Sequence, residues 1–69
     1  MEPTPENLKA FGHARWRVKF TAHLITLHEG VGGRGSPDWE LEHAEHVNRH
    51  RLAEESLAAF PAEWAELYP

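Results

Sequence analysis

Hydrophobic residues recur with helical spacing along two long segments, and each segment begins with the same kind of start signal. Residues 4–6 read Thr-Pro-Glu, and residues 36–38 read Ser-Pro-Asp. A hydroxyl side chain caps the free N–H groups of a helix, proline fits the first helical position, and an acid there favours the positive end of the helix dipole. The sequence therefore predicts helices over about residues 5–28 and 37–59.

The segment between the two predicted helices contains four glycines within residues 30–35. Such a stretch ends a helix and supplies a flexible turn, so the two helices are expected to pack antiparallel as a hairpin. Pro61 starts a third, short helix over about residues 61–67. We expect one small all-α domain over residues 1–69.

Residues 15–25 support an alternative interpretation. Polar and apolar side chains alternate there, and valine, phenylalanine and tryptophan are among the apolar ones. This pattern is typical of a half-buried strand, which would give an α+β fold. The chain has no second alternating segment with which such a strand could pair, so the helical interpretation is preferred.

Each predicted long helix carries apolar residues on two faces. In the first helix, one face holds Phe11, Ala14, Val18, Ala22 and Ile25, and the other holds Trp16, Phe20, Leu24 and Leu27. A hairpin covers one face of each helix, and residues 61–67 are long enough to cover only part of the second. We therefore predict assembly through helix faces, most simply into a homodimeric bundle.

The composition of the chain argues against two classes of partner, nucleic acids and membranes. The chain has 69 residues, no cysteine and a formal charge of −4, which argues against nucleic acid as its main partner. It has no apolar run long enough to cross a membrane and no secretory signal at its start, so we expect a cytoplasmic protein without a membrane partner.

These observations favour a non-enzymatic interaction module, an accessory or regulatory protein that binds another protein, homodimerises, or does both. No pattern of nucleophile and base indicates catalysis, and no cofactor is expected. Large aromatic side chains in central positions dominate binding energy at interfaces. The expected contact residues are Trp16, Phe20, Leu24 and Trp39, followed by Trp64 and Tyr68.

The six histidines support an alternative function, a metal-binding helical bundle. His43, His46 and His50 are spaced to share one helix face, and a hairpin turning near residue 33 brings His23 to the level of His43. Three imidazoles are a typical ligand set for a divalent metal such as zinc. The candidate ligands are His23, His43 and His46. The spacing Glu40-x-x-His43 extends this alternative to iron, because di-iron bundles use it.

Overall fold

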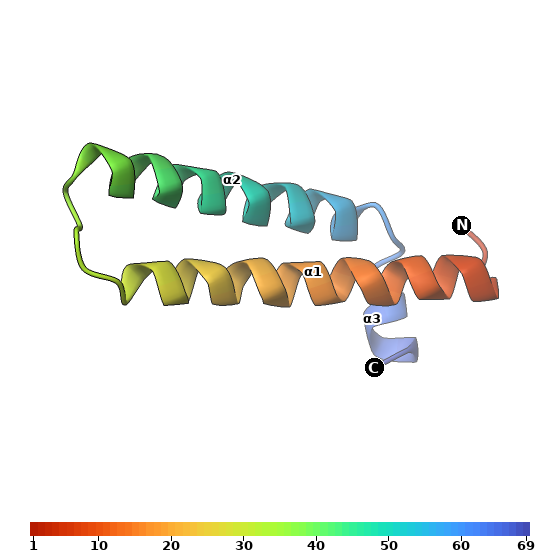
Figure 1. Ribbon diagram of the computed structural model, residues 1–69. Helices are drawn as coiled ribbons and strands as arrows, with labels where there is room; N and C mark the ends of the chain where they lie inside the picture. Colours follow the sequence, from red (N-terminus) through yellow and green to blue (C-terminus); the bar gives the residue numbers. More distant parts are fainter.

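The computed structural model describes all of residues 1–69 and contains three helices and no strand. Helix α1 spans Pro5–Glu29, α2 spans Pro37–Ala58 and α3 spans Trp64–Leu67. As Figure 1 shows, α1 and α2 run antiparallel, and α3 crosses the first half of α1. The molecule is a rod of 46 × 17 × 17 Å. The predicted all-α hairpin with a short C-terminal helix is confirmed, whereas the dimeric assembly stays a prediction.

Both predicted start signals act as helix caps. The Thr4 hydroxyl accepts a hydrogen bond of 3.1 Å from the Asn7 N–H, and the Ser36 hydroxyl accepts one of 3.2 Å from the Trp39 N–H. Proline follows each cap at the start of its helix. These bonds satisfy N–H groups that have no partner inside the helix, so the sequence fixes where α1 and α2 begin.

The predicted turn lies between α1 and α2 and depends on two of its glycines. Gly33 and Gly35 have φ angles of 98° and 95°. Residues with a side chain rarely adopt this conformation, so glycine is needed at both positions. The chain therefore reverses within residues 30–36 and brings the end of α1 beside the start of α2.

Helix α3 is shorter than the expected 61–67. Residues 61–63 form a turn in which the Trp64 and Ala65 N–H groups bond to the carbonyls three residues earlier, over 3.1 and 3.3 Å. The four-residue spacing begins only with the bond from the Leu67 N–H to the Glu63 carbonyl. Pro61 thus starts a tight turn, and the helix proper begins at Trp64.

The alternative strand over residues 15–25 is wrong, because the whole segment lies inside α1. On a helix, the alternating apolar residues separate onto different faces. Val18 is half-buried towards α2, whereas Trp16 and Phe20 are exposed. Ala22, which was grouped with Val18 on one predicted apolar face, is exposed.

The contact between α1 and α2 follows a regular alternation of three- and four-residue steps, the spacing of helices packed side by side. We call this contact the seam. Its buried and half-buried residues are Phe11, Ala14, Val18, Thr21, Ile25 and His28 on α1, and Trp39, His43, His46, His50, Ala53 and Leu57 on α2. Four histidines therefore occupy positions at which apolar side chains are usual.

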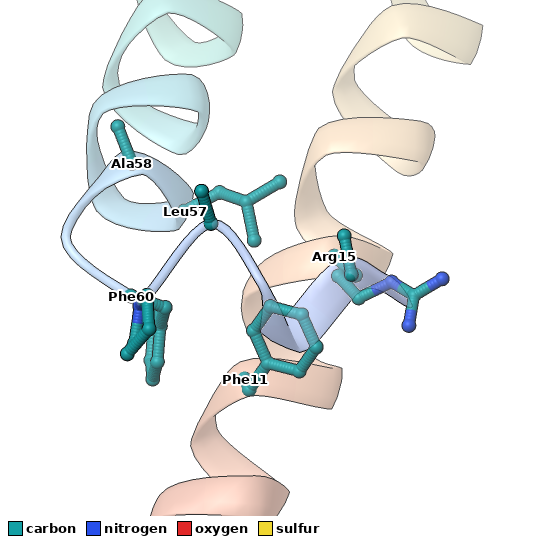
Figure 2. A pocket seen from close by; sticks show the side chains of 8 residues that line it. Phe11, Arg15, Leu57, Ala58 and Phe60 are labelled. Atoms are coloured by element: carbon teal, nitrogen blue, oxygen red, sulfur yellow. The ribbon is translucent and has the colours of Figure 1, made fainter. Parts of the chain in front are cut away.

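The end of the hairpin far from the turn is closed by an aromatic cluster, which consists of Phe11, Phe60, Trp64 and Tyr68. The Trp64 ring meets that of Phe11 edge-on at 5.6 Å between centroids and that of Tyr68 at 5.9 Å. Figure 2 shows a small hollow beside this cluster, with Phe11 from α1 and Leu57 and Phe60 from the end of α2 and the segment after it. This cluster holds α3 against α1.

Candidate functional site

The face of α1 that points away from α2 carries four large apolar side chains. We call it the outer face; it consists of Trp16, Phe20, Leu24 and Leu27. Trp16 and Phe20 stack nearly parallel, with 4.8 Å between ring centroids and 9° between planes. Trp16 and Leu27 are each 54 % exposed and Phe20 is 43 % exposed, while Leu24 is half-buried. The outer face is therefore a preformed apolar surface open to solvent.

The position of the outer face follows from helix geometry. At about 100° per residue, Trp16 and Phe20 each lie about 160° around the helix from Val18, which faces α2. Since α2 covers the Val18 side, it leaves the opposite side open. Helix α3 crosses α1 over the Phe11 ring and reaches the flank of the outer face only at the C-terminal residues.

The charged side chains of α1 between its two ends are all positive. Between Glu6 and Glu29 the sequence has no acid, and it has four cations: Lys9, Arg15, Arg17 and Lys19. None of the four pairs with a carboxylate. Arg15 instead donates a hydrogen bond to the Tyr68 carbonyl. A shallow hollow lies next to Trp16, bordered by Arg15, Lys19 and Pro69.

Helix α2 has the opposite character. It carries six acids and two arginines, and both arginines pair with glutamates one turn away. Its exposed large apolar residues are Leu41, Val47 and Leu52, and at about 100° per residue Val47 lies well over 90° around the helix from the other two. The outer surface of α2 is therefore acidic and lacks a continuous apolar stripe.

The six residues expected to contact a partner lie in two different environments. Trp16, Phe20 and Leu24 come together on the outer face. Trp39 and Trp64 are only 6 % and 3 % exposed, and Tyr68 is half-buried. Trp39 and Trp64 therefore belong to the core of the monomer and are covered before any partner arrives.

The histidines near the turn form a second unusual arrangement, the histidine cluster, which consists of His28, His43 and His46. Ring centroids of His28 and His43 lie 5.8 Å apart, and those of His28 and His46 lie 5.2 Å apart. The Trp39 ring stacks on both His28 and His43, at 4.7 and 4.8 Å. The cluster connects the last turn of α1 to the first turns of α2.

The polar atoms of this region lack hydrogen-bond partners. Five buried side-chain nitrogens of the molecule make no hydrogen bond: both nitrogens of His28, the Nδ1 atoms of His43 and His46, and Nε1 of Trp39. His28 Nε2 lies 3.4 Å from a Glu42 carboxylate oxygen, close enough for an ion pair if the imidazole is charged but without hydrogen-bond geometry. Buried nitrogens without partners are uncommon and costly, so the cluster requires an explanation.

The next histidine along the seam differs from the cluster. His50 Nδ1 lies 2.8 Å from the Thr21 hydroxyl, and its Nε2 lies 3.1 Å from Glu54. Each ring nitrogen of His50 thus lies within hydrogen-bond distance of a polar side chain, and the Thr21 hydroxyl also donates to the Arg17 carbonyl, 2.8 Å away. His50 is therefore fully partnered within the fold.

The candidate metal ligands predicted from sequence are only partly brought together. His43 and His46 belong to the histidine cluster, whereas His23 is exposed on α1. His28 occupies the place expected for His23, because it lies two heptads after the buried Ala14 and one after the buried Thr21. That seven-residue spacing is present in the sequence and identifies His28 once the buried face of α1 is known.

No helix combines the length and hydrophobicity needed to cross a bilayer. Comparisons with protein-family models, with curated proteins and with solved structures find no match.

Proposed function

We propose that this chain is a non-enzymatic interaction module that binds an acidic protein partner through the outer face of α1. The observation that carries the proposal is the stacked Trp16–Phe20 pair, half-exposed on a helix face that no other element covers. Exposing two large rings side by side is unfavourable in water, and it is typical of surfaces that are covered in a complex.

The spacing of the outer face suits a helix that lies in a groove. Taking Trp16 as position i, its other residues stand at i+4, i+8 and i+11, as in amphipathic helices that anchor in a partner's hydrophobic groove. From Trp16 to Leu27 the face is about 17 Å long at 1.5 Å per residue. Trp16 and Phe20 are already stacked on one another, an arrangement that reduces the side-chain entropy lost on binding.

The cations beside the outer face favour a different protein, rather than a second copy of this chain, as the partner. Two copies paired through the same face by a two-fold axis place the cations of one α1 beside those of the other, which is repulsive. Pairing the outer face with the acidic surface of another copy's α2 is attractive, but it is a head-to-tail contact that need not close. A different protein with an apolar groove and an acidic rim fits the surface without either cost.

Site-specific photo-cross-linking tests the proposal directly. A photoreactive phenylalanine replaces Phe20 in the full chain, expressed in its own host cell, and replaces Leu52 in a matched control. Both residues are 43 % exposed, but Leu52 lies on α2. We expect adducts from position 20 that are absent from position 52, and we expect the cross-linked protein segments to be rich in Asp and Glu.

Several outcomes contradict this proposal. Equal adducts at both positions indicate nonspecific contact. Adducts of the chain with itself, together with a dimer mass in light scattering, assign the outer face to homodimerisation. Adducts with RNA assign it to nucleic-acid binding through the cations of α1.

A further inference from the structure

The unpartnered nitrogens of the histidine cluster point to a ligand. His28 is 9 % exposed, and neither of its ring nitrogens has a hydrogen-bond partner. A neutral imidazole offers one nitrogen lone pair to a metal ion, and imidazole is among the commonest metal ligands in proteins. Three such rings gather here on two different helices.

The separations within the cluster match those of ligands that share one metal ion. Around a tetrahedral zinc with Zn–N and Zn–O distances of about 2.0–2.1 Å, neighbouring ligand atoms lie about 3.3 Å apart and imidazole centroids about 5 Å apart. His28 Nε2 and Glu42 Oε2 are separated by 3.4 Å. The centroid of His28 lies 5.2 Å from that of His46 and 5.8 Å from that of His43.

We infer that His28, His43 and His46, with Glu42 as a fourth ligand, bind one divalent transition-metal ion such as Zn²⁺. In the conformation described, no three of these side chains already converge on one point. Binding therefore requires the imidazoles to turn about their side-chain bonds, which separates His43 from its parallel stack on Trp39. Glu42 has a 65 % exposed side chain and lies on the solvent side, where an ion enters.

The surroundings favour a metal ion over a larger ligand. Neither hollow of the molecule includes a residue of the cluster, whereas a small organic molecule needs a concave site. Three imidazoles and one carboxylate suit zinc, cobalt or nickel better than calcium or magnesium, which prefer oxygen. His50 is not a ligand, because Thr21 and Glu54 already occupy both of its nitrogens.

Metal titration of the full chain tests this inference independently of any protein partner. The chain, stripped with a chelator, is titrated with Co²⁺ at pH 7.5, and Zn²⁺ is then added in competition. We expect one Co²⁺ per chain with the visible absorption of a four-coordinate ion, displaced by one equivalent of Zn²⁺. At a hundredfold excess over Kd, zinc should raise Tm by about 10 °C or more, and the gain should disappear when a chelator is added in excess.

Variants distinguish this site from surface histidines. His28→Gln should weaken zinc binding by about tenfold or more, whereas His23→Gln, on the exposed side of the same helix, should leave it unchanged. Glu42→Gln changes an exposed residue and should weaken binding about tenfold without unfolding the chain, which keeps the test valid if His28→Gln does not fold.

The inference is overturned by the absence of stoichiometric binding, or by a loss in His23→Gln equal to that in His28→Gln. A ratio of one metal per two chains also overturns it, because that ratio assigns the ion to a contact between copies.

Discussion

The two ends of the hairpin both bury aromatic rings between helices, but they differ in whether the buried ring nitrogens have hydrogen-bond partners. At the end far from the turn, Phe11, Phe60 and Trp64 pack at centroid distances of 5.5–6.0 Å, and none of the molecule's unpartnered buried nitrogens lies there. At the turn end, all five of those nitrogens lie in the histidine cluster and Trp39. Burying rings should therefore stabilise the turn end less than the aromatic end, because a buried polar atom without a partner costs free energy.

The largest expected effect is at the aromatic end. Trp64→Ala removes a side chain that is 3 % exposed and contacts three other rings. A buried Trp replaced by Ala costs about 3–5 kcal/mol, which is comparable to the total stability of a domain of this size. Urea unfolding followed by circular dichroism should show the loss, with Ala65→Ser, an exposed position in α3, as the control. A cost below about 1 kcal/mol would show that α3 does not hold α1.

At the turn end, a substitution is expected to raise the free energy of unfolding rather than lower it. His28→Leu, measured in the presence of a chelator, replaces an imidazole with two unpartnered nitrogens by an apolar side chain of similar size. Removing buried polar atoms that lack partners should raise the free energy of unfolding by about 1 kcal/mol, even though the stack on Trp39 is lost. His13→Leu, at an exposed site, is the control. Destabilisation by His28→Leu indicates that the imidazole nitrogens are satisfied in solution.

The third prediction concerns His50, the seam histidine that has partners. Thr21→Val keeps the shape of the side chain and removes the hydroxyl that lies 2.8 Å from His50 Nδ1. The variant should lose about 1 kcal/mol of stability, the usual contribution of such a bond. Thr26→Val on the exposed side of α1 is the matched control, because Thr26 bonds only to the backbone of its own helix. Equal effects in both variants show that the bond to His50 contributes nothing.

The smallest effect is expected in the turn itself. Val31 is 61 % exposed, and Val31→Ala should change stability by less than about 0.5 kcal/mol. Thermal melts of the two chains should coincide within about 4 °C. A larger change means that this loop contributes to the histidine cluster beyond joining the helices.

Local signals in the sequence were sufficient to predict where the helices begin and turn. Thr4 and Ser36 cap as expected because a cap involves only its own three or four residues. The glycines of residues 30–35 ended α1 for equally local reasons. The end of α3 nearest Pro61 was misjudged, because proline also suits a tight turn, and local pattern does not distinguish a turn from the first turn of a helix.

The choice of buried face could not be made from local pattern. Both long helices are apolar on two sides, so the pairing of α1 with α2 decides whether Trp16 or Val18 is buried. That pairing also decides whether His23 or His28 meets His43. The face of α1 that packs against α2 is the one on which Ala14, Thr21 and His28 lie seven residues apart and are buried together. The sequence-based prediction favoured large aromatic side chains for binding and so placed Trp39 and Trp64 on a binding surface, although large aromatic side chains suit a core equally well.

The position of the turn also determines the order in which the hairpin can assemble. His28 and Trp39 are separated by only eleven residues, whereas Arg15 and Tyr68, which meet at the other end, are separated by 53. Closing the longer loop costs about 1.4 kcal/mol more chain entropy than closing the shorter one. The helices should therefore pair first near the turn, so that the histidine cluster forms early and the aromatic cluster forms last. Variants at His28 should mainly change the folding rate, and variants at Trp64 should mainly speed unfolding.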